Sequence, residues 1–101
     1  MAFVILKLKQ NVGEPYAIYD LEKFGVWPFK KKRLVIGAES DRNDIILMTS
    51  RVKKRKFGEI VKTEEGWKYK ILSGNKIKEG IFIHGIKIPI FDNVIEFKEE
   101  L

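Results

Sequence analysis

The feature that most constrains this chain is a series of short apolar runs, spaced about ten residues apart and separated by turn-forming residues. Several runs alternate apolar and polar residues, as half-buried strands do, and no stretch keeps a helical period over three turns. Closely spaced strands of this kind predict an all-β fold, either an antiparallel β-sandwich or a small barrel. The expected strands cover residues 3–8, 16–19, 33–36, 44–47, 57–62, 67–72, 80–84, 86–91 and 94–97.

The segments between these runs carry their own signals. Residues 9–14 are expected to supply a turn, centred around Gly13-Glu14-Pro15, and Thr63-Glu64-Glu65-Gly66 suits a tight hairpin. Residues 76–79 are expected to be a lysine-rich link. Residues 20–32 are predicted to be an ordered loop, because clustered aromatic side chains usually pack. The aromatic residues of this loop are Phe24, Trp27 and Phe29.

Length and composition exclude several classes of protein. With 101 residues, the chain is expected to form one domain over residues 1–101, and a hydrophobic share of 45% excludes disorder. No apolar run approaches the roughly 18 residues of a membrane span. The chain has no cysteine, which excludes disulfides and thiolate metal sites. Together with the absence of an export signal, this favours a cytoplasmic location.

The charge points to anionic partners. Twenty basic residues against 14 acidic ones give a net charge of +6, although a lysine- and glutamate-rich composition is also typical of heat-adapted proteins. Two clusters stand out. The first, Lys30-Lys31-Lys32-Arg33, is expected to be solvated surface. The second, between Arg51 and Lys56, is predicted to form an anion-binding rim, with a solvated loop that protects an edge strand as the alternative.

Catalytic chemistry finds no support in the sequence. His84 is the only histidine and is expected to be structural or exposed, so no histidine-based metal site is predicted. The carboxylate pairs Glu64-Glu65 and Glu99-Glu100 lie in a turn and a tail, without the apolar surroundings that raise a carboxyl pKa. No glycine pattern matches a phosphate-binding loop. We therefore expect no enzyme activity, no cofactor, no metal and no small-molecule substrate.

Two segments resemble the forkhead-associated (FHA) family. In that family a strand ends in Ile-Gly-Arg, and a polar loop leads to Asn-Asp-Ile-x-Leu; here Arg33-Leu34-Val35-Ile36-Gly37 precedes Asn43-Asp44-Ile45-Ile46-Leu47. Farther along, Leu72-Ser73-Gly74-Asn75 is similar to the family's Leu-x-Ser-x-Asn. Residues 80–85 are similar to its Gly-Thr-x-Val-Asn-Gly, displaced by an insertion of residues 76–79. The resemblance runs from the first strand to Phe97.

This resemblance implies an FHA/SMAD-like antiparallel β-sandwich of about 9–11 short strands, with loops at one end that recognise phosphothreonine. The scaffold positions fit the family pattern, but most binding positions differ. Ala38 stands for the loop arginine, Lys53 for the phosphate-contacting serine, Lys54 for the next arginine, Lys56 for the buttressing histidine and Ile81 for the threonine. Asn75 alone matches a peptide-contacting residue. Phosphothreonine selectivity is therefore expected to be absent, or replaced by a looser preference for acidic segments.

The predicted function is protein–protein interaction, through acidic or phosphorylated segments of a partner or as a phosphorylation-independent assembly domain. The candidate ligand-binding residues are Arg51, Lys53, Lys54, Lys56, Ser73 and Asn75. The alternative is a small β-barrel that binds single-stranded nucleic acid, for which exposed aromatic side chains would be needed. Trp67 and Tyr69 share one strand face, as do Phe82 and His84, although such aromatic residues more often pack in a core.

Overall fold

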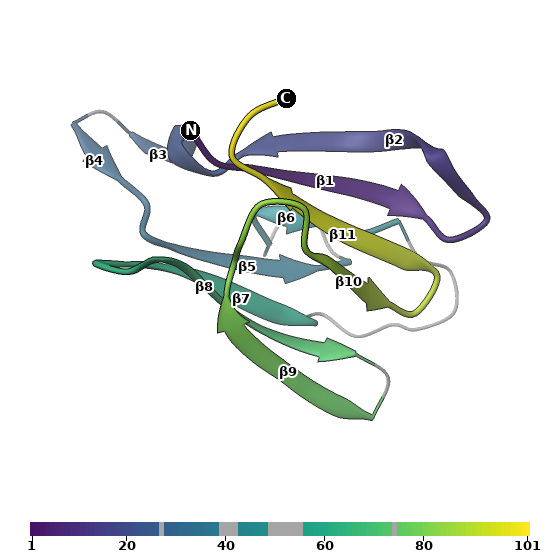
Figure 1. Cartoon of the computed structure of the whole chain (residues 1–101). Coiled ribbons are helices and arrows are strands. Elements are labelled where there is room, and N and C mark those ends of the chain that lie inside the picture. Colours follow the sequence, from purple (N-terminus) through teal and green to yellow (C-terminus); the bar gives the residue numbers. More distant parts are fainter. Residues whose placement is uncertain (27, 39–42, 49–55, 74) are drawn as a thin grey trace.

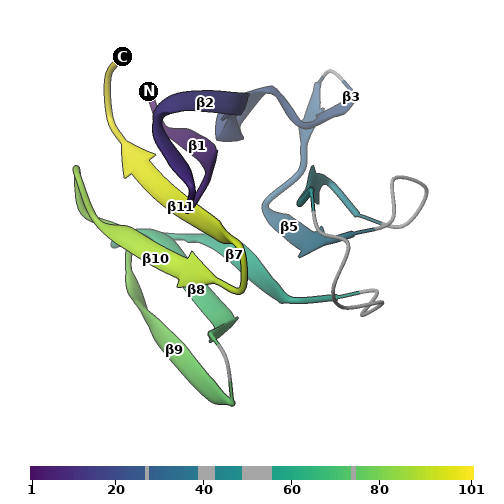
Figure 2. The ribbon, with the colours of Figure 1, turned by 90° about the vertical axis from the view of Figure 1, so that its right-hand side faces the viewer.

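The computed structural model describes residues 1–26, 28–38, 43–48, 56–73 and 75–101. These residues form eleven strands and one short 3₁₀ turn, so the prediction of an all-β fold is confirmed. Two sheets pack against each other as a β-sandwich (Figures 1 and 2). Among the described residues, no helix is long and apolar enough to cross a membrane.

The first sheet has four antiparallel strands in the order β10-β11-β1-β2. Its strands are β1 (Phe3–Leu8), β2 (Asn11–Asp20), β10 (Lys87–Ile90) and β11 (Asn93–Lys98). The two central strands, β1 and β11, come from opposite ends of the sequence, with Phe3 opposite Lys98 and Leu8 opposite Asn93. Strands β10 and β2 are therefore its two edges.

The second sheet has five strands in the order β6-β5-β7-β8-β9. Its strands are β5 (Arg33–Gly37), β6 (Ile45–Ile46), β7 (Gly58–Thr63), β8 (Gly66–Ser73) and β9 (Lys76–Ile81). All its pairs are antiparallel except β5–β6, in which Ile36 lies beside Ile45. A two-stranded ribbon of β3 (Gly25–Val26) and β4 (Phe29–Lys30) follows the 3₁₀ turn η1 (Leu21–Lys23).

Alternation along the strands builds the core between the sheets. The central strands send every second side chain inward, because successive side chains of a strand point to opposite faces. The four-stranded sheet contributes Val4 and Leu6, and the five-stranded sheet contributes Ile36, Ile60 and others, all fully buried. Two stacked aromatic rings, Phe82 and Phe97 at 4.8 Å between centroids, close one end of this core.

The hairpin predicted at residues 63–66 is confirmed. Thr63 lies opposite Gly66, and Glu64-Glu65 form the turn. The Thr63 hydroxyl donates to the Gly66 carbonyl at 2.8 Å and accepts from the Glu65 amide at 3.2 Å. Gly66 has φ +124°, a conformation that glycine adopts without the steric cost of a side chain.

The turn expected within residues 9–14 is present, but its centre, expected around residues 13–15, is wrong. Strand β2 already begins at Asn11, and the turn lies at residues 9–10, where the Lys9 amide donates to the Asp92 carbonyl at 2.8 Å. Register shifts in the β1–β2 pairing absorb the irregular residues, with Pro15 opposite Lys7. An edge strand tolerates a proline because only one side of its backbone needs ladder hydrogen bonds.

The link expected at residues 76–79 is also wrong. These residues are strand β9, in which Lys76 pairs with Ser73 and Ile81 with Lys68. Residues 82–86 form the connection instead, with Gly85 at φ +88°, so the strand expected at 80–84 ends at Ile81. Backbone pairing with β8 keeps this lysine-rich segment extended. The pairing does not require burial of the lysines, whose side chains stay in water.

The loop expected at residues 20–32 contains the ribbon of β3 and β4. Its aromatic side chains differ in how far they are packed. Phe24 stacks on Tyr19 at 6.0 Å, as expected, whereas Phe29 is 80% exposed. Trp27 lies outside the described residues.

Three polar groups join the two sheets. The side chain of Asn93, which is 0% exposed, accepts a hydrogen bond from the Tyr16 hydroxyl at 2.5 Å and donates to the Met48 carbonyl at 3.0 Å. The Tyr16 oxygen accepts from the Met48 amide at 3.0 Å, and Tyr19 does the same for Ile46 at 3.3 Å. Burial raises the pKa of the Tyr16 phenol. We call Tyr16, Met48 and Asn93 the cross-sheet network.

Replacement of Asn93 tests the cross-sheet network. We expect Asn93→Ala to lower the free energy of unfolding by about 2–3 kcal/mol, because it removes the hydrogen bonds of the buried Asn93 side chain to Tyr16 and Met48 and opens a small void. Urea unfolding followed by circular dichroism measures the change. Asn75→Ala, at an exposed asparagine, is the matched control and should stay within about 0.5 kcal/mol of the wild type. Equal losses in both variants would contradict a special role for Asn93.

One carboxylate is buried on the outer face of the four-stranded sheet. Glu96 lies opposite Ile5 and Lys87, and its side chain accepts from the Lys7 ammonium at 3.0 Å. Burial alone raises the pKa of Glu96, but the hydrogen bond and charge of Lys7, with Lys98 and Lys87 nearby, outweigh it. The net result is a pKa below the ordinary value of 4.5.

A depressed carboxyl pKa stabilises the fold above the unfolded-state pKa, and the effect is lost as the pH falls through the folded-state pKa. We expect Glu96→Gln to be about 1–2 kcal/mol less stable than the wild type at pH 7. The difference should begin to shrink below pH 4.5, where the unfolded chain binds a proton, and should be lost as the pH falls through the lower pKa of the folded protein. Urea unfolding at several pH values between 3 and 7 measures it. A constant difference across that range would contradict the assignment.

Candidate functional site

The predicted binding residues that the structure describes lie at one end of the five-stranded sheet. Strands β5 and β8 end there and β7 and β9 begin there, because Ile36 pairs with Gly58, Gly58 with Ile71 and Ile71 with Lys78. We call this the loop end; it is the right-hand side of Figure 1. Ser73, Asn75 and Lys56 all lie at the loop end, and Ala38 follows the last residue of β5.

The three described candidates have different surroundings. The Ser73 hydroxyl donates to the Pro89 carbonyl of the facing sheet at 2.6 Å, so its proton points into the protein. The Asn75 side chain is exposed in the β8–β9 turn. Lys56 has an exposed ammonium that lies 3.4 Å from Glu59. Asn75 and Lys56 can therefore meet a ligand, whereas Ser73 fastens β8 to β10.

The remaining candidates, Arg51, Lys53 and Lys54, lie outside the described residues. Both described flanks of their segment are anchored at the loop end. On one side Met48 belongs to the cross-sheet network, and on the other the Phe57 amide donates to the Ile36 carbonyl at 2.7 Å.

The charge at the loop end is partly balanced by one acidic residue. Glu59 receives Arg33 at 2.9 Å and Lys56 at 3.4 Å on the same carboxylate oxygen. Burial raises the pKa of Glu59, but the charges of Lys56 and Arg33 and their hydrogen bonds outweigh this effect and leave the pKa below its ordinary value. Two cations thus share one carboxylate, and the three side chains together keep a net charge of +1.

A shallow groove of about 310 Å³ runs beside these residues. It lies on the five-stranded sheet between the start of β7 and the start of β9, and it is lined by Lys56, Glu59, Lys70, Leu72 and Ile77, among others. Ile77 is 61% exposed. The groove therefore combines apolar surface with two lysines.

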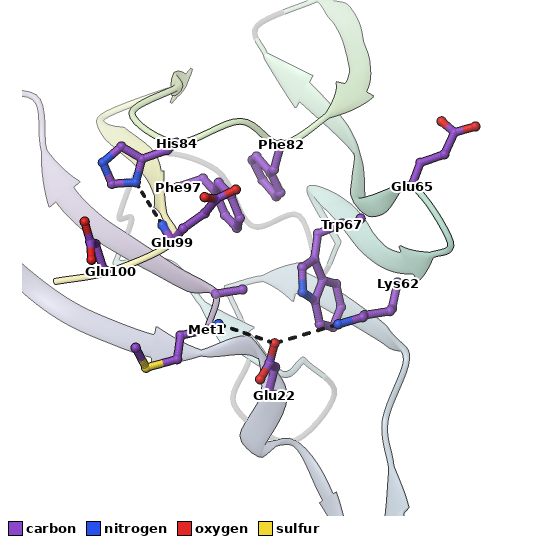
Figure 3. A pocket seen from close by; sticks show the side chains of 12 residues that line it. Met1, Glu22, Lys62, Glu65, Trp67, Phe82, His84, Phe97, Glu99 and Glu100 are labelled. Atoms are coloured by element: carbon purple, nitrogen blue, oxygen red, sulfur yellow. Dashed lines mark hydrogen bonds and ion pairs between the residues drawn. The ribbon is translucent and has the colours of Figure 1, made fainter.

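Sequence reasoning missed a larger pocket at the opposite end, near the two chain termini (Figure 3). Its volume is about 740 Å³, and Trp67, Phe82 and Phe97 supply its apolar lining. Lys62 lies over the Trp67 ring at 5.2 Å and pairs with Glu22 at 3.7 Å. The hairpin register carried this signal, because the turn at 63–66 places Lys62 opposite Trp67.

The polar groups of this pocket are mostly engaged with one another. The Glu22 carboxylate oxygen that pairs with Lys62 also lies 4.0 Å from the amino terminus. The exposed His84 accepts the Glu99 amide on Nδ1 at 3.0 Å. The indole N–H of Trp67 is buried without a hydrogen-bond partner. Within the described part of the chain, no group of three or more His, Cys, Asp or Glu side chains could hold a metal ion.

The aromatic side chains named for base stacking belong to the core. Trp67 is 5% exposed and Phe82 is 4% exposed. Tyr69 is partly buried against Phe82 at 4.7 Å between ring centroids. The core-packing interpretation of these residues is confirmed, and they offer no open stacking platform.

No protein-family model, no curated protein and no solved structure matches this chain. The FHA resemblance therefore stays a prediction from the sequence motifs.

Replacement of Ser73 separates a structural role from a binding role. We expect Ser73→Ala to lower the free energy of unfolding by about 1 kcal/mol, because the Pro89 carbonyl loses its donor. The same variant should bind acidic peptides like the wild type, since the serine proton does not face a ligand. Urea unfolding and peptide titration measure the two effects. Unchanged stability together with weakened binding would reverse this assignment.

Proposed function

We propose that this chain is a protein-interaction module of the FHA type that binds acidic or phosphorylated segments of a partner at the loop end. One observation carries the proposal most directly. The flanks of the basic cluster and the exposed Asn75 lie at the same end of one sheet, held there by strand register and by the cross-sheet network.

The chemistry of the loop end supports a loose preference for anions. Each charge-assisted hydrogen bond contributes about 1.5–3 kcal/mol net, so several lysines together can hold a carboxylate-rich or phosphorylated segment. Lysines act as mobile point charges and lack the fixed fork of an arginine. Discrimination between phosphothreonine and a cluster of acidic residues should therefore be small.

The nucleic-acid alternative has less support, because single-strand binders stack bases on exposed rings, whereas Trp67 and Phe82 are buried and Tyr69 is partly buried. It becomes an outcome of the binding experiment.

The test uses fluorescence polarisation with three labelled peptides of one backbone sequence: phosphorylated, unphosphorylated and glutamate-substituted. We expect the phosphorylated and glutamate forms to bind within about threefold of each other and the unphosphorylated form to bind more weakly. Lys53→Glu with Lys54→Glu should reduce affinity for both anionic peptides by about tenfold or more, and added salt should weaken binding.

The matched control reverses the same amount of charge elsewhere. Lys23 and Lys68 are exposed and lie away from the loop end, so Lys23→Glu with Lys68→Glu changes the net charge equally. Equal losses in the two double variants would indicate a net-charge effect and contradict a site at the loop end. Stronger binding to a single-stranded oligonucleotide than to any peptide would favour the nucleic-acid alternative.

A further inference from the structure

The four edge strands of the two sheets are protected to different degrees. An edge strand presents unpaired N–H and C=O groups, and proteins usually blunt such edges with prolines, bulges, short strands, charged side chains such as lysine, or covering groups. Strand β6 is two residues long, and tyrosine hydroxyls cover its Ile46 amide and the Met48 amide that follows the strand. Strand β2 contains Pro15 and register shifts.

Strand β10 has two protections. The Phe97 amide donates to the Ile86 carbonyl, so Ile86 and Phe97 form a hydrogen-bonded pair in the ladder between β10 and β11. Antiparallel pairs alternate, so the backbone of Pro89 faces the free edge. Proline has no N–H there, and the outward Pro89 carbonyl already accepts from Ser73.

Among its described residues, strand β9 is protected only by the charged side chains of Lys76, Lys78 and Glu79, which leave its backbone groups open to a strand of complementary charge. It pairs with β8 over all six of its residues without a register shift, it contains no proline, and it lies at the margin of the molecule in both ribbon views (Figures 1 and 2). The Phe82 amide donates to the Trp67 carbonyl, so the backbone of Phe82 faces β8. Successive residues of β9 then point alternately away from β8 and toward it. The backbone groups of Ile77, Glu79 and Ile81 therefore point to the open edge.

Pairing between two copies of β9 is disfavoured by charge. Residues directly opposite each other in a sheet have their side chains on the same face. When two identical antiparallel strands pair around a two-fold axis, the residue at the axis must therefore lie opposite its own copy. The two registers with the greatest overlap are centred on Lys78 and on Glu79. The first places two Lys78 side chains opposite each other, and the second places two Glu79 side chains opposite each other. Like charges in these positions are destabilising.

We propose that β9 binds an extended segment of another protein by strand addition, and that this segment alternates acidic with apolar residues. Lys76 and Lys78 lie on one face of β9 and would face the acidic residues. Ile77 and Ile81 lie on the other face, with Glu79 between them, and would face the apolar residues. Ile77 also lines the groove beside Leu72. The proposal rests on the protein-binding function and names the kind of partner strand.

A proline at position 79 tests the proposal. Glu79→Pro removes an outward N–H without touching the ladder to β8, which is the arrangement that the chain already has at Pro89. The probe is a capped, labelled peptide that alternates glutamate with valine and threonine. We expect the wild type and Glu79→Ala to bind it similarly, and Glu79→Pro to bind it at least about tenfold more weakly. In the wild type the peptide should slow amide hydrogen exchange at Ile77 and Ile81.

Two further peptides define the chemistry, one alternating lysine with valine and threonine and one with the glutamates gathered in a block. Both should bind at least about tenfold more weakly than the alternating glutamate peptide. Equal unfolding free energies of Glu79→Ala and Glu79→Pro would establish that the proline acts on binding. If the proline variant is destabilised, N-methylated peptides replace it in the binding test. N-methylation removes the same hydrogen bonds from the side of the partner strand.

The outcome also separates this proposal from the loop-end site. Binding that is lost in Lys53→Glu with Lys54→Glu but kept in Glu79→Pro would overturn strand addition and leave the loop-end site in place. The opposite pattern would support strand addition and overturn the loop-end site. Absence of binding to the alternating glutamate peptide would overturn strand addition.

Discussion

A sandwich of two open sheets must satisfy or protect the backbone groups along four edges, and the structure depends on how it does so. The hydroxyls of Tyr16 and Tyr19 on the edge strand β2, together with Asn93 of the central strand β11, join the first sheet to Ile46 of the edge strand β6 and to Met48 just after it. Ser73 joins β8 to β10 in the same way. The tyrosine hydroxyls therefore cover backbone amides, Asn93 and Ser73 cover backbone carbonyls, and all four connect the two sheets.

Much of the fold could be predicted because its signals are local. Alternation fixed most strands, and Glu-Gly at residues 65–66 fixed the β7–β8 hairpin. Strand β9 could not be predicted, because a run with two lysines and a glutamate shows no buried face. It is extended only because β8 lies beside it, and strand preference depends strongly on such neighbours. The same holds for β2, where Pro15 suggested a turn.

The site was predictable only in part, for a related reason. A sequence motif places Ser73 near the loop end, but it does not indicate that the hydroxyl donates to the carbonyl of Pro89, 16 residues farther along the chain. Asn75 and Lys56 lie at the loop end as the motif implied, and Arg51, Lys53 and Lys54 lie outside the described residues. The difference between β9 and the other edges follows from sheet order, which no single segment encodes.

The central position of β1 and β11 in one sheet has a kinetic consequence. Lys7 and Glu96 are 89 residues apart in sequence, yet their strands are hydrogen-bonded neighbours. Closing so long a loop costs entropy before any burial compensates for it, so such topologies fold in milliseconds to seconds, far more slowly than helical bundles. The hairpins of the five-stranded sheet can form early, because their strands are close in sequence. The four-stranded sheet, which covers the other side of the core, forms only when β1 and β11 pair.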